Sequence, residues 1–229
     1  MYHHVPYKVF LHWVLLISLV VFATALLFDL GVLSNILTQD ITRLTAVILL
    51  LFFATSCHAG YRAWLLSTEF NQLDRWQTEQ PARAGRFNLV GSYLLLSPHD
   101  ASDSALTAEV FAEKLRGPHQ PGWFITGVLV KLGLLGTVVG FILMLNSVHG
   151  LENLDTSDIK ELMQQMTEGM GIAMNTTLVG LVSSILLGTQ YLLLDRAADQ
   201  LVTHTLELGE LQQATRADQA LTDLESELD

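Results

Sequence analysis

The sequence contains few charged residues, a single cysteine, and no acidic residue within its longest apolar stretches. Only 15% of its 229 residues are charged, against roughly 25% in an average soluble domain. The single cysteine, Cys57, excludes a disulfide within the chain and a cysteine-rich zinc cluster. Lys and Arg together number 12 and the net charge is −11, which argues against a nucleic-acid partner because phosphate binding needs clustered basic side chains.

Four stretches of the chain lack Asp, Glu, Lys and Arg altogether. They cover residues 9–28, 44–61, 132–148 and 169–194. Each is close to the length of about 20 residues that a helix needs to cross a bilayer. Four such spans leave about 140 residues outside the hydrocarbon, which is too few for a large enzymatic domain. The sequence therefore predicts an all-α membrane protein with four transmembrane helices and helical cytoplasmic extensions.

The basic residues predict how the chain is oriented, because Lys and Arg near span ends are retained on the cytoplasmic side. Most of them precede the first span, lie between the second and third, or follow the fourth, whereas acidic residues dominate the loop after the third. Both termini are therefore expected in the cytoplasm. The predicted segments are a cytoplasmic N-terminus (1–8), the first span (9–29), an outer loop (30–43), the second span (44–62), a cytoplasmic helical loop (63–120), the third span (121–148), an outer loop with a surface helix (149–168), the fourth span (169–194) and a cytoplasmic helical tail (195–229).

Apolar residues at helical spacing predict further helices outside the spans. One covers residues 105–116 and is broken by Gly117 and Pro118. Another continues beyond the fourth span as an apolar stripe between acidic residues. A third, residues 158–166, is short enough to lie on the membrane surface.

The third and fourth spans each carry small and hydroxyl side chains on one helical face. These are Gly133, Gly136, Thr137 and Gly140 in the third span, and Thr176, Thr177, Gly180 and Ser184 in the fourth. Thr137 and Thr177 lie at depths of roughly 16 and 12 Å from the outer ends of their spans, so antiparallel helices put both hydroxyls near one level. Intramembrane polar residues are costly, so these positions are the first candidates for function.

Two interpretations of these faces remain open. In one, the small residues only allow close helix packing and each threonine bonds its own helix. In the other, Thr137, Thr176 and Thr177 belong to an ion pathway, because threonine oxygens can ligate Na⁺ or order water. The small residues would then pack around a partner helix; these are Gly133, Gly136, Gly140, Gly180 and Ser184.

No span has an Asp or Glu near its middle, so the chain alone offers no side chain suited to bind and release a proton there. An ion carrier must therefore come from a partner. Lys131 is expected to extend to the inner interface, and His58 to form interfacial hydrogen bonds there. No catalytic residue, metal ligand or cofactor is predicted.

The strings LGLLGTVVGF and MGIAMNTTLVGLVSSI, joined by a short acidic loop, resemble the MotA/TolQ/ExbB family of ion-driven motor subunits. Thr137 matches the threonine of the family's LG-x-x-GT motif, and Thr177 the threonine three residues before the glycine of the final span. The resemblance implies a homopentamer in the bacterial inner membrane around two copies of a single-span MotB/TolR/ExbD-like partner. The partner's membrane Asp would carry the ion, either H⁺ or Na⁺.

The resulting expectation is a non-enzymatic subunit that couples ion flow to rotation of a pentamer about a dimeric core. The alternative is a structural tetraspan scaffold without ion conduction. A solute transporter is disfavoured because the spans lack inverted-repeat halves. An enzyme is disfavoured because no base, nucleophile and orienting group occur at a recognisable spacing. The machine that receives the work stays open.

Overall fold

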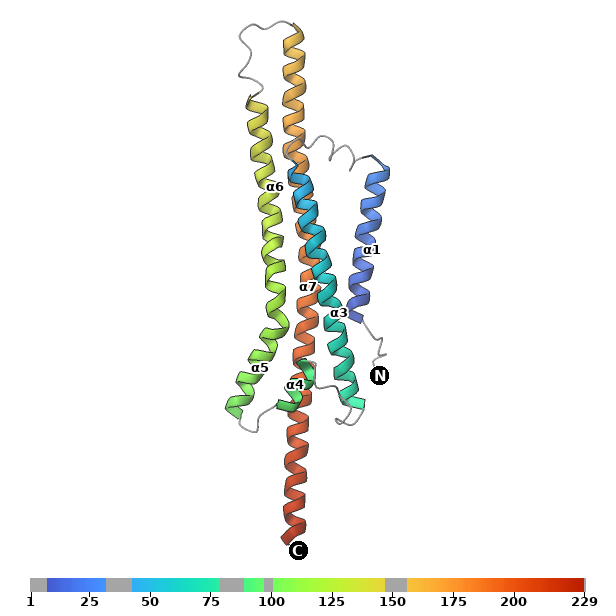
Figure 1. Cartoon of the computed structure of the whole chain (residues 1–229), viewed down its shortest axis with the longest axis vertical. Coiled ribbons are helices and arrows are strands. Elements are labelled where there is room, and N and C mark those ends of the chain that lie inside the picture. The colour runs from blue at the N-terminus through green and yellow to red at the C-terminus, as the bar shows by residue number, and fades with distance from the viewer. Residues whose placement is uncertain (1–7, 32–42, 79–88, 97–100, 147–155, 229) are drawn as a thin grey trace. The chain divides into compact units, whose positions relative to one another are not determined.

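The computed structural model describes residues 8–31, 43–78, 89–96, 101–146 and 156–228, and within them every regular element is a helix (Figure 1). This agrees with the all-α prediction. The helices are α1 (Lys8–Asp29), α3 (Leu44–Thr78), α4 (Leu89–Leu96), α5 (Ala101–Arg116), the 3₁₀ turn η2 (Gly117–His119), α6 (Gln120–Asn146) and α7 (Thr156–Leu228). Four helices in the described residues are long and apolar enough to cross a membrane, as predicted.

Several helices run past the predicted ends of their spans. Helix α3 continues from the apolar stretch to Thr78, because Ala63, Leu66 and Leu73 repeat at helical spacing and are all buried. Helix α7 is one unbroken helix of 73 residues. It includes residues 158–166, which were predicted as a separate surface helix and are instead the first turns of α7. The predicted spans at 121–148 and 9–29 correspond closely to α6 and α1.

The chain divides into two compact units, which are described separately. The span unit consists of residues 13–60 and 121–192, and the extension unit of residues 1–12, 61–120 and 193–229. In the span unit, α6 and the first part of α7 run antiparallel and side by side (Figure 1). The first helix of the chain, α1, buries only a small share of its surface here: Leu15, Leu19 and Phe22 are each about two-thirds exposed.

The extension unit has its own small core around α4. Val90 and Leu94 of α4 are almost fully buried, and the ring of Tyr93 stacks on Phe111 of α5 with 4.9 Å between ring centroids. A carboxylate caps this short helix, because Glu69 of α3 accepts hydrogen bonds from the backbone N–H groups of Leu89 and Val90, both at 3.2 Å.

A single 3₁₀ turn replaces the predicted break between the cytoplasmic helix and the third span. Helix α5 ends at Arg116, η2 covers Gly117–His119, and α6 begins at Gln120 with Pro121 in its first turn. Proline is tolerated in a first turn because that N–H has no partner within the helix.

Candidate functional site

Helices α6 and α7 meet along a seam of small residues, at which their backbones approach closely. Gly133, Gly136 and Gly140 of α6 are all buried. A Cβ atom added at Gly140 would lie 2.8 Å from the Cβ of Ala173, and one added at Gly180 would lie 2.9 Å from the Cα of Gly133. Real Cβ atoms do not approach so closely, so only glycine allows this packing.

A hydroxyl crosses the seam at Thr177. Its Oγ1 donates to the backbone oxygen of Gly133 on α6 at 3.0 Å. The same Oγ1 lies 3.1 Å from the backbone oxygen of Ala173 in its own helix. Because a hydroxyl carries one proton, these two acceptors share it and the lone pairs of Oγ1 remain available. Thr177 is half-buried, so its oxygen is held beside the seam without being enclosed by it.

The hydroxyl of Thr137 lies on the same helix pair. Its Oγ1 donates to the backbone oxygen of Leu134 in its own helix, and the residue is half-buried. Gly136 faces Thr176 directly across the seam. Thr137 follows Gly136 and Thr177 follows Thr176, and the two helices run in opposite directions. At 1.5 Å per residue, the two threonines therefore differ by only about 3 Å in position along the helix axes. The structure therefore keeps the two hydroxyls near one level.

Thr176 has a different environment from its neighbour. It is fully buried against Gly136, and its Oγ1 donates to Ile172 of its own helix at 2.9 Å. A hydroxyl enclosed in this way cannot contact an ion that passes along the surface of the chain. Within this chain Thr176 is thus part of the seam, and its place in an ion pathway stays a prediction.

The small residues predicted to surround a partner helix also lie in this seam. Gly133, Gly136 and Gly140 pack against α7, Gly180 packs against Gly133, and the Oγ of Ser184 donates to Thr126 of α6 at 3.0 Å. Within the chain these residues therefore pack α6 against α7, and their packing around a partner helix stays a prediction.

Exposed apolar side chains flank the seam on both helices. On α6 they are Leu134, Leu135, Val138, Phe141 and Ile142, and on α7 they are Leu178, Leu181, Val182 and Ile185. Large exposed apolar surfaces mark contacts with lipid or with other protein chains. The half-buried threonines lie between this surface and the seam.

One comparison with known proteins gives a match, and it falls on this pair of helices. Residues 124–207 match the MotA/TolQ/ExbB proton channel family, and this segment contains nearly all of α6 and the part of α7 that forms the seam. The match covers 84 of the 229 residues of the chain. The prediction from the two sequence strings is therefore confirmed. Comparison with curated proteins and with solved structures gives no match.

A second polar cluster in the span unit joins three helices of the chain. The side-chain oxygen of Gln190 on α7 accepts hydrogen bonds from Ser56 of α3 at 2.9 Å and from the indole N–H of Trp13 on α1 at 3.3 Å. Gln190 is 1% exposed, and within the described residues no group accepts a hydrogen bond from its Nε2. Because the indole can only donate, the oxygen of Gln190 must face Trp13.

The next residue, Tyr191, extends this cluster. It is fully buried, its hydroxyl lies 2.9 Å from the Nδ1 of His58, and its ring lies so close to Gly122 of α6 that a Cβ there would overlap it. The predicted hydrogen bond of His58 is therefore present. Gln190 and Tyr191 were not among the residues predicted from the sequence, although a glutamine in a charge-free stretch is itself a signal of an intramembrane polar contact.

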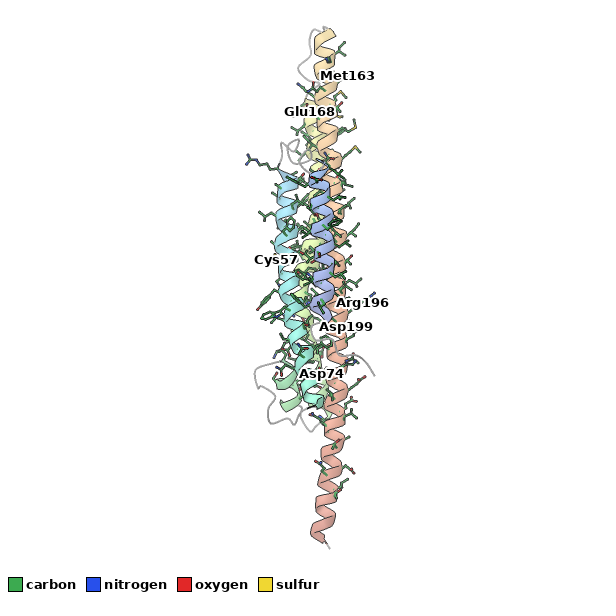
Figure 2. All side chains as sticks on the ribbon, turned by 90° about the vertical axis from the view of Figure 1, so that its right-hand side faces the viewer. Cys57, Asp74, Met163, Glu168, Arg196 and Asp199 are labelled. Carbon is green, nitrogen blue, oxygen red and sulfur yellow. The ribbon has the colours of Figure 1, made fainter. Side chains whose placement is uncertain are left out.

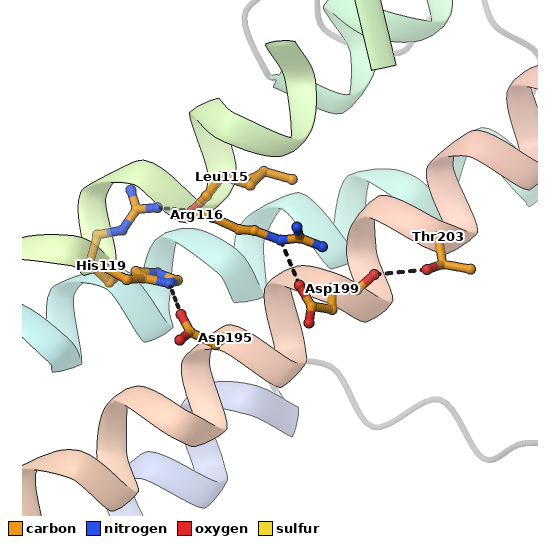
Figure 3. A network of polar contacts seen from close by, with 7 residues as sticks. Leu115, Arg116, His119, Asp195, Asp199 and Thr203 are labelled. Atoms are coloured by element: carbon orange, nitrogen blue, oxygen red, sulfur yellow. Dashed lines mark hydrogen bonds and ion pairs between the residues drawn. The ribbon is translucent and has the colours of Figure 1, made fainter. Parts of the chain in front are cut away.

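The extension unit contains a network of charged groups around η2 (Figure 3). The Nδ1 of His119, a residue only 1% exposed, lies 2.7 Å from a carboxylate oxygen of Asp195 on α7. One turn further along α7, Asp199 forms an ion pair with Arg116 at 2.7 Å. Arg62 of α3 donates to the backbone oxygen of Leu115 at 3.0 Å. Together these contacts fix the turn between α5 and α6 to α7 and α3.

One ionisable group of the extension unit has a shifted pKa. Burial of the Tyr93 ring, with a smaller effect from the carboxylate of Glu210, raises the pKa of Tyr93 above its ordinary value of 10. Among the described residues, no group of three or more His, Cys, Asp or Glu side chains could hold a metal ion. Cys57 is exposed on α3 (Figure 2).

Proposed function

We propose that this chain is the channel-forming subunit of an ion-driven motor in the bacterial inner membrane. Five copies would surround two copies of a single-span MotB/TolR/ExbD-like partner, and ion flow would turn the pentamer about that core. The observation that supports the proposal most directly is the family match, which includes both helices of the seam and both candidate threonines. A proton channel family is not an enzyme family, so the proposal includes no reaction.

The division of labour between the two proteins follows from side-chain chemistry. Between Lys131 and Asn146 of α6, and between Gly169 and Leu194 of α7, there is no carboxylate. Hydroxyl oxygens can order water or ligate Na⁺, but they do not bind and release a proton near neutral pH. The partner's Asp would carry the charge, and Thr137 and Thr177 would form the polar lining that stabilises it while it is ionised. A gradient supplies about 2.3 kcal/mol per charge at 100 mV.

Membrane orientation is part of the same proposal. With both termini in the cytoplasm, the segments 63–120 and 195–229 would be cytoplasmic and the segment 149–168 would be outside. The basic residues support this orientation, because most Lys and Arg residues near the spans lie in the segments predicted to be cytoplasmic. Whether H⁺ or Na⁺ is transported is decided by measuring ion flow at fixed voltage with Na⁺ removed.

The test uses the chain co-expressed with its single-span partner and reconstituted into vesicles. Thr137→Val and Thr177→Val remove a hydroxyl at nearly constant volume, and both are expected to lower ion flow at least tenfold. Thr177→Ser keeps the hydroxyl and should restore most of the flow. The matched control is Thr189→Val, because Thr189 is an exposed threonine of the same helix that also bonds its own backbone. Each variant must show the same mass of complex as the parent.

Two results would count against the motor function. Unchanged ion flow in both valine variants would remove the threonines from the pathway. A monomer or dimer that neither captures the single-span partner nor conducts ions would instead identify a structural tetraspan scaffold.

A further inference from the structure

Four of the six methionines of the chain lie within twelve consecutive residues of α7. They are Met163, Met166, Met170 and Met174. At 3.6 residues per turn, these positions fall within about 80° of the helix circumference, so they form one stripe. Figure 2 shows sulfur atoms along this part of α7, from the labelled Met163 onward.

The side chains of this stripe are exposed. Met163, Met170 and Met174 are 64%, 52% and 66% exposed, and Met166 is partly exposed. Met144 of α6 is different, because its Cβ lies against the seam at Gly169. Flexible methionine commonly fills irregular gaps in packed regions, but the four residues of the stripe do not do so within the chain.

The side chains of the stripe differ in type from those at the other exposed apolar positions of this helix. Further along α7, exposed apolar positions are occupied by Leu178, Leu181 and Ile185, which shows that branched aliphatic side chains serve on this helix. The methionines occur instead beside exposed polar groups such as Glu168 (Figure 2), which accepts a hydrogen bond from Gln164 at 3.1 Å. A thioether differs from leucine chiefly in its sulfur lone pairs, which are soft donors that select Cu(I) among biological metals.

The spacing also suits a shared ligand. Residues three and four apart on a helix have Cβ atoms about 5–6 Å apart, and methionine has three rotatable side-chain bonds. Met166 lies three residues from Met163 and four from Met170, whereas Met163 and Met170 are about 10 Å apart along the helix axis. Two neighbouring sulfurs, that of Met166 and that of either Met163 or Met170, can therefore bind one ion between them. We infer that Met166 with one of these two neighbours forms a two-coordinate binding site for a soft monovalent metal ion, Cu(I) or its analogue Ag(I), near the start of α7. This site is independent of the proposed ion transport.

The experiment is a titration of Ag(I) into the purified full-length chain in detergent micelles. The parent protein carries Cys57→Ser, because the exposed thiol of Cys57 is itself a soft ligand. About one Ag(I) per chain is expected, with Cu(I) competing for it and Zn(II) not competing. The variant with Met163→Leu, Met166→Leu and Met170→Leu keeps the side-chain volumes nearly constant and should weaken binding at least about tenfold.

A matched control and a second measurement keep the test decisive. Met144→Leu changes a methionine of α6 and should leave Ag(I) binding unchanged. In protein labelled with ¹³C at the methionine methyl groups, Ag(I) should shift the signals of the stripe and leave that of Met144 in place. If the triple variant does not fold, the single variant Met166→Leu is measured by the same shifts. Undiminished binding in the leucine variants, or no binding once Cys57 is replaced, overturns the inference.

Discussion

Gly136 is the position at which the seam between α6 and α7 can be tested most sharply. Alanine at this position would place a Cβ within the van der Waals radius of the Thr176 side chain, which is itself fully buried. Overpacking of this kind costs about 1–3 kcal/mol. The gain in helix propensity from Gly to Ala is about 0.5–1 kcal/mol, so the substitution is expected to be destabilising overall.

The matched control lies on the same helix. A Cβ at Gly127 meets nothing within 4 Å, so Gly127→Ala should be neutral or slightly stabilising. Equilibrium unfolding of both variants in mixed micelles gives the free energies of unfolding. Removing the opposing side chain in the double variant Gly136→Ala with Thr176→Gly should recover part of the loss, with a coupling energy of about 0.5–3 kcal/mol. Equal stability of Gly136→Ala and Gly127→Ala would refute the close approach of the two helices.

Three further predictions concern the polar contacts. Gln190→Leu removes the acceptor of the buried Ser56 hydroxyl and of the partly buried indole N–H of Trp13, and should lower the free energy of unfolding by about 1–3 kcal/mol in the same assay. Arg116→Gln removes an ion pair whose side chains are half exposed and should cost at most about 1 kcal/mol, whereas His119→Leu removes a buried partner of its carboxylate and should cost more. Because the pKa of Tyr93 is raised in the folded state, the unfolded state loses the phenolic proton at a lower pH than the folded state does. The free energy of unfolding is therefore unaffected by this group below about pH 10 and falls as the pH rises further. Tyr93→Phe should reduce that fall, which is measured by unfolding at a series of pH values from about 9 to 11.

The sequence predicted the helices well and the faces of those helices less well. Charge-free stretches locate spans reliably, because bilayer thickness and the cost of charge in hydrocarbon act on each segment by itself. The same local signal could not show that α7 is continuous from Thr156 to Leu228, because its first turns carry a polar composition typical of a surface helix. It also could not separate Thr176 from Thr177, adjacent residues of which only the second keeps access to the surface beside the seam.

Contacts between distant segments explain the other differences. The partners of Gln190 are 134 and 177 residues away in the chain, so no local spacing connects them. Likewise, the contact between His119 and Asp195 cannot be predicted from their spacing in the sequence, because it depends on the packing of α7 beside η2. Hydroxyl and amide groups within a charge-free stretch can be recognised in the sequence as candidates for function, but their partners depend on helix packing.

The seam also limits where motion can occur in a working complex. Its contacts join backbone to backbone at Gly133 and Gly180 and leave no flexible side chains to absorb a shift, so α6 and α7 should move as one body. Energy from ion flow would then appear as motion relative to the partner, and a covalent bond across the seam should be harmless. Gly140→Cys with Ala173→Cys places two sulfurs across the seam in a Cys57→Ser background. A Cβ at Gly140 would lie 2.8 Å from the Cβ of Ala173 and from backbone atoms of Ala173 and Gly169, so the helices must separate locally by about 1 Å to reach the Cβ–Cβ distance of a disulfide. The reduced double variant has the same local separation and is therefore the reference for the oxidised form. Ion flow in the reconstituted complex is expected to be equal in the oxidised and reduced forms, whereas a loss on oxidation that is reversed by reductant would show that sliding between α6 and α7 is part of the working cycle.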